Sequence, residues 1–346
     1  MATDLAWRLG VEVELLAPPG RSRRDLAEEL ARRSQGTVQR FFHPQSEPSR
    51  VKGIEIFENL TLGFKIFDGS GQEIAKCVDD LTLQRDLQRR AASKKGWYRI
   101  VSDDPRLLRL VMLHGDPERD LPEAIEPIAK LFRTPLNRGP KGMFRVADSV
   151  GAPICIAAPL PGERERPCEI ITPPLDDNHE ERLEGLLSPA RELGFTIPAE
   201  GAVHLHFDAE PLCSATTFSN LVTTLDGRRE ELRAKLGTNP RCRRLGPWPP
   251  ELLELVSTTE FRSLPWEEAR TRVAALKPTK YRDFNIRNMA LGLKSKHTFE
   301  VRILPVWTRA EPILRAAMVF ERILQEAMSH QLVDDSHYRR PRLKVV

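Results

Sequence analysis

The first strand expected in this sequence alternates strictly between two kinds of residue. From Trp7 to Leu15 the odd positions are all apolar, whereas the even positions carry Glu12 and Glu14 among them. An alternation with period two predicts a β-strand that buries one face and presents the other to polar surroundings. The chain must therefore build a sheet with one packed face and one face that carries carboxylates.

Later segments repeat this arrangement with other ligand-type residues. His204 and His206 alternate with apolar neighbours in one segment, Glu300 and Arg302 do so in another, and Glu169 lies in a third. Residues i and i+2 of a strand lie on the same face, roughly 6–7 Å apart. Carboxylates suit hard cations such as Mg²⁺, which accept imidazole as one ligand, and arginine suits a phosphate that is being transferred. These strands therefore predict a site for metal ions and a polyphosphate.

Each pattern taken alone has a plainer interpretation. A strand of the form Glu-x-Glu is usually a solvated face, and Glu-x-Arg is usually an exposed ion pair. A His-x-His strand is as often a surface pair as a zinc site. The occurrence of all of them in one chain is what favours a functional site.

The remaining elements predict an α+β fold, because strands and helices do not alternate strictly along the chain. A capping box formed by Ser22 and Asp25 predicts a helix that ends at Arg33. The other expected strands are 52–60, 63–67, 73–78, 144–146, 153–158, 168–172, 201–207 and 298–304. The other expected helices are 178–194, 211–236, 265–276 and 311–328.

The segment 84–140 differs in composition from the rest. Residues 84–93 are basic and have a helical pattern, and proline and charged residues are frequent after residue 116. We interpret it as an insertion or a cap on the main fold, with an extension of the sheet edge as the alternative. Residues 1–330 are then a single catalytic domain, and 331–346 form a basic C-terminal tail.

Composition excludes several other classes of protein. The 53 Lys and Arg residues against 49 Asp and Glu give a net charge of +4, which is too small for a general nucleic-acid binder. No apolar run is long enough to cross a membrane. The 5 cysteines are scattered without a CxxC pair, so neither a disulfide framework nor a thiolate zinc site is expected. The start of the sequence lacks an apolar signal region, and we expect a cytoplasmic protein.

Five segments in order resemble the amidoligase family, which belongs to the carboxylate–amine ligase superfamily typified by glutamine synthetase and glutamate–cysteine ligase. The segments are GVEVE (10–14), CEIITPPL (168–175), GAVHLHFD (201–208), YRDFNIRN (281–288) and TFEVRILP (298–305). The resemblance runs from about residue 7 to 328, with 84–140 the least matched part.

The resemblance implies a role for each matching residue. The implied metal ligands are Glu12, Glu14, Glu169, His204 and Glu300. The residues implied for nucleotide binding are His206, Asn285 and Arg287, and those implied for phosphoryl transfer are Arg302 and Arg282. The family's Asp-x-Ser-Leu element has two candidates here, Asp80 and Asp148, and the sequence does not decide between them.

The resemblance also implies a fold and a reaction. The fold would be glutamine-synthetase-like, with a curved antiparallel sheet that lines a nucleotide funnel and helices packed outside. The reaction would be ATP-dependent formation of an amide or peptide bond through an acyl phosphate, with Mg²⁺ or Mn²⁺, from a carboxylate and an amine such as amino acids or peptides. The alternatives are a phosphotransferase like the guanidino kinases on the same fold, and a non-catalytic binding module. The sequence names neither the two substrates nor the oligomeric state.

Overall fold

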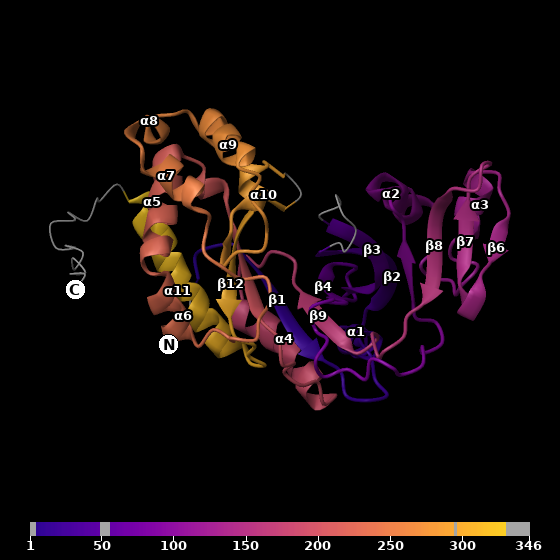
Figure 1. Ribbon diagram of the computed structural model, residues 1–346. Coiled ribbons are helices and arrows are strands. Elements are labelled where there is room, and N and C mark those ends of the chain that lie inside the picture. Colours follow the sequence, from indigo (N-terminus) through magenta and orange to yellow (C-terminus); the bar gives the residue numbers. More distant parts are fainter. Residues whose placement is uncertain (1–4, 49–55, 294–295, 330–346) are drawn as a thin grey trace, which may run out of the picture.

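Two lobes share one large sheet in the computed structural model, which describes residues 5–48, 56–293 and 296–329. The strand lobe (37–48 and 56–159) carries β2 to β8 and lies at the right of Figure 1. The helical lobe (203–329) carries β10 to β12 and most of the helices, and lies at the left. Strands β1 and β9 connect the two lobes. The basic tail 331–346 and the start of the expected strand 52–60 lie outside the described residues.

Within the described residues the sheet has 12 strands, and its order is β11-β12-β10-β1-β9-β4-β3-β5-β8-β7-β6, with β2 paired to β3. The strands are Leu9–Leu16 (β1), Thr37–Pro48 (β2), Ile56–Phe67 (β3), Glu73–Val78 (β4), Tyr98–Val101 (β5), Leu136–Arg138 (β6), Phe144–Ala147 (β7), Pro153–Pro159 (β8), Pro167–Ile171 (β9), Val203–Asp208 (β10), Phe284–Asn285 (β11) and Thr298–Leu304 (β12). All of the strand pairs are antiparallel, and β11 and β6 end the sheet without meeting. The expected mixture of helices with an antiparallel sheet is confirmed, and the sheet is open.

The α-helices are Arg23–Arg33 (α1), Pro105–His114 (α2), Glu126–Leu131 (α3), His179–Glu192 (α4), Ala215–Gly227 (α5), Arg229–Leu236 (α6), Pro250–Ser257 (α7), Thr259–Arg262 (α8), Trp266–Ala275 (α9), Arg287–Ala290 (α10) and Ala310–Met328 (α11). Short 3₁₀ turns lie at Pro140–Gly142 and Glu210–Leu212. No helix of the described ranges is both long and apolar enough to span a membrane.

The apolar face of strands β1, β10 and β12 forms one side of the hydrophobic core. Val11, Leu205 and Val301 are neighbours across β1, β10 and β12, and all three are fully buried. The same core holds the inner faces of α5 and α11, including Phe218 and Phe320. Burial of this face against helices leaves the opposite face of the same strands for the polar residues.

The α1 helix begins as the sequence predicts, because the Asp25 carboxylate accepts a hydrogen bond from the Ser22 backbone N–H at 2.8 Å. The helix expected at 84–93 is wrong, since that segment forms turns. Besides turn bonds within the segment, its backbone groups bond to other segments: Ala91 O accepts from Gly162 N–H, and Arg85 N–H donates to Glu200. Tertiary contacts here override the local helical preference.

The segment 84–140 supplies β5, α2, α3 and β6. Strand β5 pairs with β3 on one side and with β8 on the other, so this part of the segment continues the sheet. Strands β2 and β5 were not expected from the sequence. The two segments expected at 52–60 and 63–67 are, where described, one continuous strand, β3.

Candidate functional site

Strand register brings the ligand-type residues together on the polar face. Glu12 of β1 lies opposite His204 of β10, and Glu14 lies opposite Glu169 of β9. His206 pairs in the same way with Glu300 of β12. Direct neighbours in antiparallel strands have side chains about 5 Å apart on the same face, so residues as distant in sequence as Glu12 and Glu300 form one cluster.

His204 lies at the centre of four carboxylates. Its Nδ1 is 3.1 Å from a Glu12 oxygen, 3.7 Å from a Glu300 oxygen and 4.0 Å from a Glu169 oxygen. Its Nε2 is 3.6 Å from a Glu14 oxygen. All of these side chains are largely buried, with at most 14% of the side chain exposed. A cluster of four acids around one imidazole is an arrangement that a divalent cation would stabilise.

A second group surrounds the other end of the Glu12 carboxylate. Its Oε1 is 3.0 Å from His206 Nε2 and 3.2 Å from Lys296 Nζ. His206 Nε2 is also 3.9 Å from Glu300, which accepts a hydrogen bond of 2.6 Å from the Asn285 amide. Gly10 lies opposite His206, and a Cβ at this position would approach the His206 Cβ to 3.3 Å, so a glycine leaves room for the imidazole.

Two sets of ligand atoms in this cluster are close enough to share a metal ion. One set is Glu12, Glu169 and His204, and the other is Glu12, His206 and Glu300; the atoms of each set lie within 4.8 Å of one another. Glu12 belongs to both sets and would bridge two ions. The second set includes His206, which the resemblance assigns to the nucleotide, so the geometry makes it a candidate ligand as well.

The charge states differ between the carboxylates. Burial, followed by repulsion from Asp80 and Glu169, raises the pKa of Glu14 well above its usual range. Burial, followed by repulsion from Glu12 and Asp80, does the same to the pKa of Glu169. Burial also acts on Glu12, but attraction to His206 and Lys296 outweighs it and lowers its pKa. A bound cation would favour the charged forms of Glu14 and Glu169, against the effects of burial and repulsion.

Arg302 lies beside Glu300 on β12 and donates to its carboxylate at 2.5 Å. Against the effect of burial, the Arg302 charge lowers the pKa of Glu300 to about 2. The Arg302 Nε is buried and has no hydrogen-bond partner among the described residues. The ion pair with Glu300 would be a purely structural role for Arg302, and a contact with phosphate is the alternative. The Nε is a donor that the ion pair does not use.

Two pockets meet at this cluster. The first, of about 260 Å³, contains Glu14, Glu169, His204 and Arg302. The second, of about 530 Å³, is more apolar and includes Phe41 and His206. Glu12, His43, Ile171 and Lys296 line both pockets, so the metal-binding candidates lie at their junction. Among the described residues of 84–140, none lines either pocket, and the expectation that this segment caps the site gains no support.

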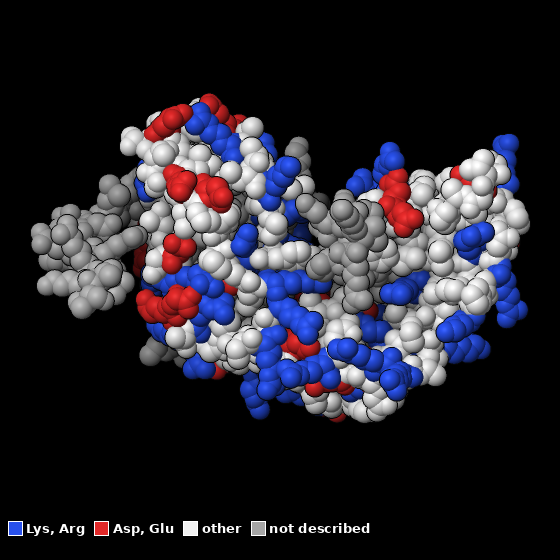
Figure 2. All heavy atoms as spheres, viewed as in Figure 1, with Lys and Arg blue, Asp and Glu red and all other residues white. Residues whose placement is uncertain are grey.

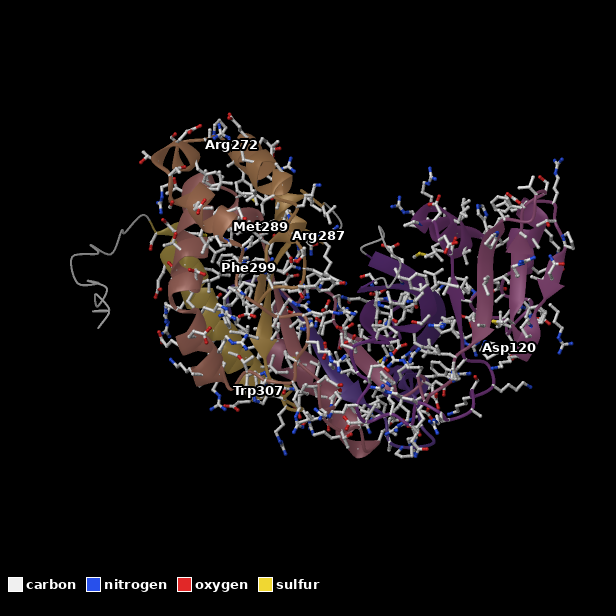
Figure 3. The ribbon with its side chains drawn as sticks, viewed as in Figure 1. Asp120, Arg272, Arg287, Met289, Phe299 and Trp307 are labelled. Carbon is white, nitrogen blue, oxygen red and sulfur yellow. The ribbon has the colours of Figure 1, made fainter. Side chains whose placement is uncertain are left out.

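The structure does not bring every predicted residue to the cluster. Arg282 donates to the Pro247 carbonyl at 2.8 Å and lines a separate pocket. Arg287 lies at the edge of the helical lobe and is exposed, in contrast to Phe299 and Met289 inside it (Figure 3). Its backbone N–H, at the start of α10, donates to Asn285. The roles implied for Arg282 and Arg287 therefore stay predictions without geometric support.

Sequence reasoning missed several residues of the site. Lys296 and the basic residues around Arg244 come from irregular segments, where no periodic pattern marks them. Asp80 lines the first pocket near Glu14, whereas its rival Asp148 lies in an exposed turn between β7 and β8. Figure 2 shows Lys and Arg side chains gathered across the middle and lower part of the molecule, around the region where the lobes meet.

Comparison with known proteins gives one match. The model of a family described as "Putative amidoligase enzyme" matches residues 5–334, nearly the whole chain. No curated protein matches the chain significantly. The same is true of the solved structures.

Proposed function

The chain belongs to the amidoligase family, and from this premise we propose that it is an ATP-dependent ligase that joins a carboxylate to an amine through an acyl phosphate. We further propose that it shares the glutamine-synthetase-like fold of the carboxylate–amine ligase superfamily. The first argument is the sheet: an open antiparallel sheet with helices on its apolar face and charged residues on its polar face is the arrangement that such a fold requires.

One observation carries the proposal: strand register gathers Glu12, Glu169, His204, His206 and Glu300 into two overlapping sets of metal ligands. Formation of an acyl phosphate brings a carboxylate and a polyphosphate together, and both are anions. A site for this step needs concentrated positive charge in a place from which water is excluded. Buried ligand sets that share Glu12 meet this need if each holds a divalent cation.

The residues present fit Mg²⁺ or Mn²⁺. Oxygen ligands dominate both sets, with one imidazole in each, which suits hard divalent cations better than soft ones. The raised pKa of Glu14 and of Glu169 points the same way, because burial and repulsion between the acids outweigh any attraction to the chain's own cations. When bound, the ions would neutralise phosphate oxygens. The chain's own contribution is to hold Glu12 in position between Lys296 and His206.

The wider pocket suits the nucleotide. Its walls include Phe41, Pro173 and Pro174, which offer apolar contact to a base, and Lys296 also lines it. A nucleotide placed there would direct its terminal phosphate towards the junction with the smaller pocket. The acid would then occupy the smaller pocket beside Arg302.

The reaction places different demands on two cations of the chain. In the first step the acid's carboxylate oxygen attacks the terminal phosphorus of ATP and ADP leaves. In the second step the amine attacks the acyl carbon and inorganic phosphate leaves. Arg302, with its planar guanidinium, suits the transferring group, since its charge is permanent and its donors are fixed in direction. Lys296 at the junction suits the phosphate chain of the nucleotide.

The direct test is a screen for phosphate release. The protein is incubated with ATP and Mg²⁺ and with pooled amino acids, polyamines and peptides, and the products are identified by mass spectrometry. We expect free phosphate, ADP and a new amide in equal amounts. A phosphorylated product without free phosphate would instead identify a phosphotransferase. An absence of binding to Mg²⁺ and ATP by calorimetry would identify a non-catalytic module and end the proposal.

A further inference from the structure

A third group of metal-type ligands lies apart from the two sets that share Glu12. Its ligand atoms are a carboxylate oxygen of Glu210, the Cys213 Sγ and a ring nitrogen of His297, and they lie within 4.8 Å of one another. Glu210 and Cys213 follow β10, and His297 directly precedes β12. Because β10 and β12 are antiparallel neighbours, the end of one strand lies beside the start of the other.

The distances in this group fit a tetrahedral zinc site. The Cys213 Sγ is 3.8 Å from His297 Nε2, and a Glu210 oxygen is 3.6 Å from His297 Nδ1. Zinc–sulfur and zinc–nitrogen bonds of about 2.3 and 2.0–2.1 Å at a tetrahedral angle separate the two ligand atoms by about 3.5 Å. The thiol and Nε2 therefore lie close to the separation that one ion requires. The Glu210 carboxylate can turn from Nδ1 towards Nε2, because its side chain is 81% exposed.

Hydrogen bonds join the two segments that carry the ligands. The Ala209 N–H donates to the His297 carbonyl at 3.1 Å, and the Ala209 carbonyl accepts from the Cys213 thiol at 3.2 Å. The Glu210 N–H donates to the Asp208 carboxylate at 3.1 Å. The backbone around the group is therefore already ordered, and the main conformational cost of binding a metal is the lost freedom of the exposed Glu210 side chain.

Negative charge gathers around the thiol. Burial, followed by repulsion from three carboxylates, raises the pKa of Cys213 to about 12; the carboxylates are those of Glu210, Asp208 and Glu267. Arg270 acts in the opposite direction, but its guanidinium is paired with Glu267. This surplus of negative charge attracts a divalent cation, which on binding would displace the thiol proton.

The ligand types select the ion. Thiolate and imidazole are usual ligands of Zn²⁺, whereas Mg²⁺ and Mn²⁺ prefer oxygen. The two sets that share Glu12 consist of carboxylates and imidazoles and include no sulfur, so the two kinds of site should bind different ions. A thiolate zinc site was not expected from the sequence, because no CxxC pair marks one. This group uses a single thiolate, and Cys213 and His297 are 84 positions apart.

We propose that Cys213, His297 and Glu210 bind one Zn²⁺ ion, with water as the fourth ligand. The ion would join the segment that follows β10 to the start of β12 and stabilise the folded chain at this point. Binding of this ion does not depend on the proposed reaction, since it concerns residues outside the cluster on the polar face.

The ion would also fix two contacts of that cluster. The residue before His297 is Lys296, which donates to Glu12 at 3.2 Å. The residue after it is Thr298, whose hydroxyl is 3.3 Å from His206 Nδ1. Zinc at His297 would therefore act as a positioning device for these neighbours without contacting the substrates.

The test uses Co²⁺ as a spectroscopic substitute for Zn²⁺. The metal-free protein, in excess Mg²⁺, is titrated with Co²⁺ and then with Zn²⁺. We expect a thiolate-to-cobalt charge-transfer absorption that saturates at one equivalent and that Zn²⁺ abolishes. Cys213→Ser should remove this absorption, and both Cys213→Ser and His297→Ala should weaken Zn²⁺ binding at least about tenfold. Zinc should raise the Tm of the wild type and not that of Cys213→Ser.

The matched control is Cys242→Ser. Cys242 is half-buried like Cys213, whereas the other three cysteines are buried, and it lines the first pocket, where it is the alternative thiolate. This variant should keep the absorption and the wild-type affinity for Zn²⁺. No thiolate absorption in the wild type, its survival in Cys213→Ser, or its loss in Cys242→Ser alone would overturn the proposal. Unchanged Zn²⁺ affinity in His297→Ala would do the same.

Discussion

The two ends of the sheet use the same architecture for different purposes. In β1, β9, β10 and β12 the polar face carries buried charges, and Glu12, His204 and Glu300 are each at most 7% exposed. At the other end, β6 has two exposed residues out of three, and large apolar side chains such as Leu113 and Val150 face outward. Neither pocket at the candidate ligand cluster includes a described residue of 84–140.

This difference shows what a buried polar face requires. Charged groups that lose water must gain other partners, or their charge states shift. Strands β1, β9, β10 and β12 meet this requirement through their register, which places their charged groups beside one another. They keep an excess of negative charge, which a cation can neutralise. The outer strands keep their polar groups in water, so their sequence is free of this constraint. The comparison predicts where substitutions matter and where they do not.

The largest effect is expected from Glu12→Gln. Glu12 belongs to both candidate ligand sets, so the loss of its charge should lower ATP-dependent turnover by at least about 10³-fold, more than the loss of one preorganised donor. Phosphate release at saturating Mg²⁺ measures the effect. Glu126→Gln on α3, where the carboxylate is 52% exposed and pairs with Lys130, is the control in the outer region and should retain full turnover. Comparable losses of turnover in both variants would contradict the distinction between the two ends of the sheet.

The second prediction concerns Arg302→Lys, which keeps the charge and removes the planar fork. We expect kcat to fall by on the order of 10²–10³, with little change in ATP affinity or Tm, because the contact tightens mainly in the transition state. Steady-state kinetics and thermal melting are measured on the same preparation. A loss of stability with kcat nearly intact would mean that the ion pair with Glu300 is the residue's main role.

The third prediction separates stability from function. Because Glu169 has a raised pKa, its charged form destabilises the metal-free fold, and Glu169→Gln should raise the Tm at neutral pH by on the order of 1–3 °C. The same change should weaken Mn²⁺ binding at least about tenfold. A matched change on the exposed face of α4, Glu181→Gln, should alter neither property. A lower Tm for Glu169→Gln would show that its carboxylate is already compensated without metal.

The pH dependence follows from the same shift. Between the unfolded pKa of about 4.3 for glutamate and the raised folded values of Glu14 and Glu169, the folded protein binds more protons than the unfolded chain. The metal-free protein should therefore lose stability from this source as pH rises through that window. Mg²⁺ with nucleotide should reverse the loss, since metal binding displaces protons. Melting curves between pH 4 and 8, with and without Mg²⁺ and ADP, measure both effects.

The smallest effect concerns backbone protection. We expect β6 and β7 to exchange their amide hydrogens faster than β1 and β10, because the outer strands are short and lie at the sheet's end. Mg²⁺ with ADP should increase protection in β1, β10 and β12 and leave β6 and β7 unchanged. Hydrogen exchange followed by mass spectrometry resolves these segments. Equal protection throughout, with or without ligand, would contradict the contrast between the two ends.

The sequence predicted the strands of the site well, since alternation marks β1, β10 and β12 directly. It could not predict register, which pairs Glu12 with His204 and Glu14 with Glu169, because pairing depends on contacts between distant segments. Strand β2 was missed, as Pro44 interrupts its pattern and proline is uncommon within strands.

The basic side of the first pocket was missed for a different reason. Arg243 and Lys280, which line that pocket, lie in irregular segments, whose conformation depends on single hydrogen bonds and not on a repeated pattern. Arg282 is the opposite case. A sequence motif identified it as a candidate site residue, but in the fold its side chain donates to the Pro247 carbonyl. Motifs identified the strand residues of the cluster, whereas the loop residues that line the same pocket could be identified only from the structure.

The central claim is that Glu12 bridges two divalent cations on the polar face of the sheet. The most direct measurement is anomalous diffraction from crystals grown with Mn²⁺ and a non-hydrolysable ATP analogue. The account predicts two Mn²⁺ ions that share Glu12, one with Glu169 and His204 and the other with His206 and Glu300. Manganese bound by other residues, or a cluster without metal in the presence of the nucleotide, would contradict it.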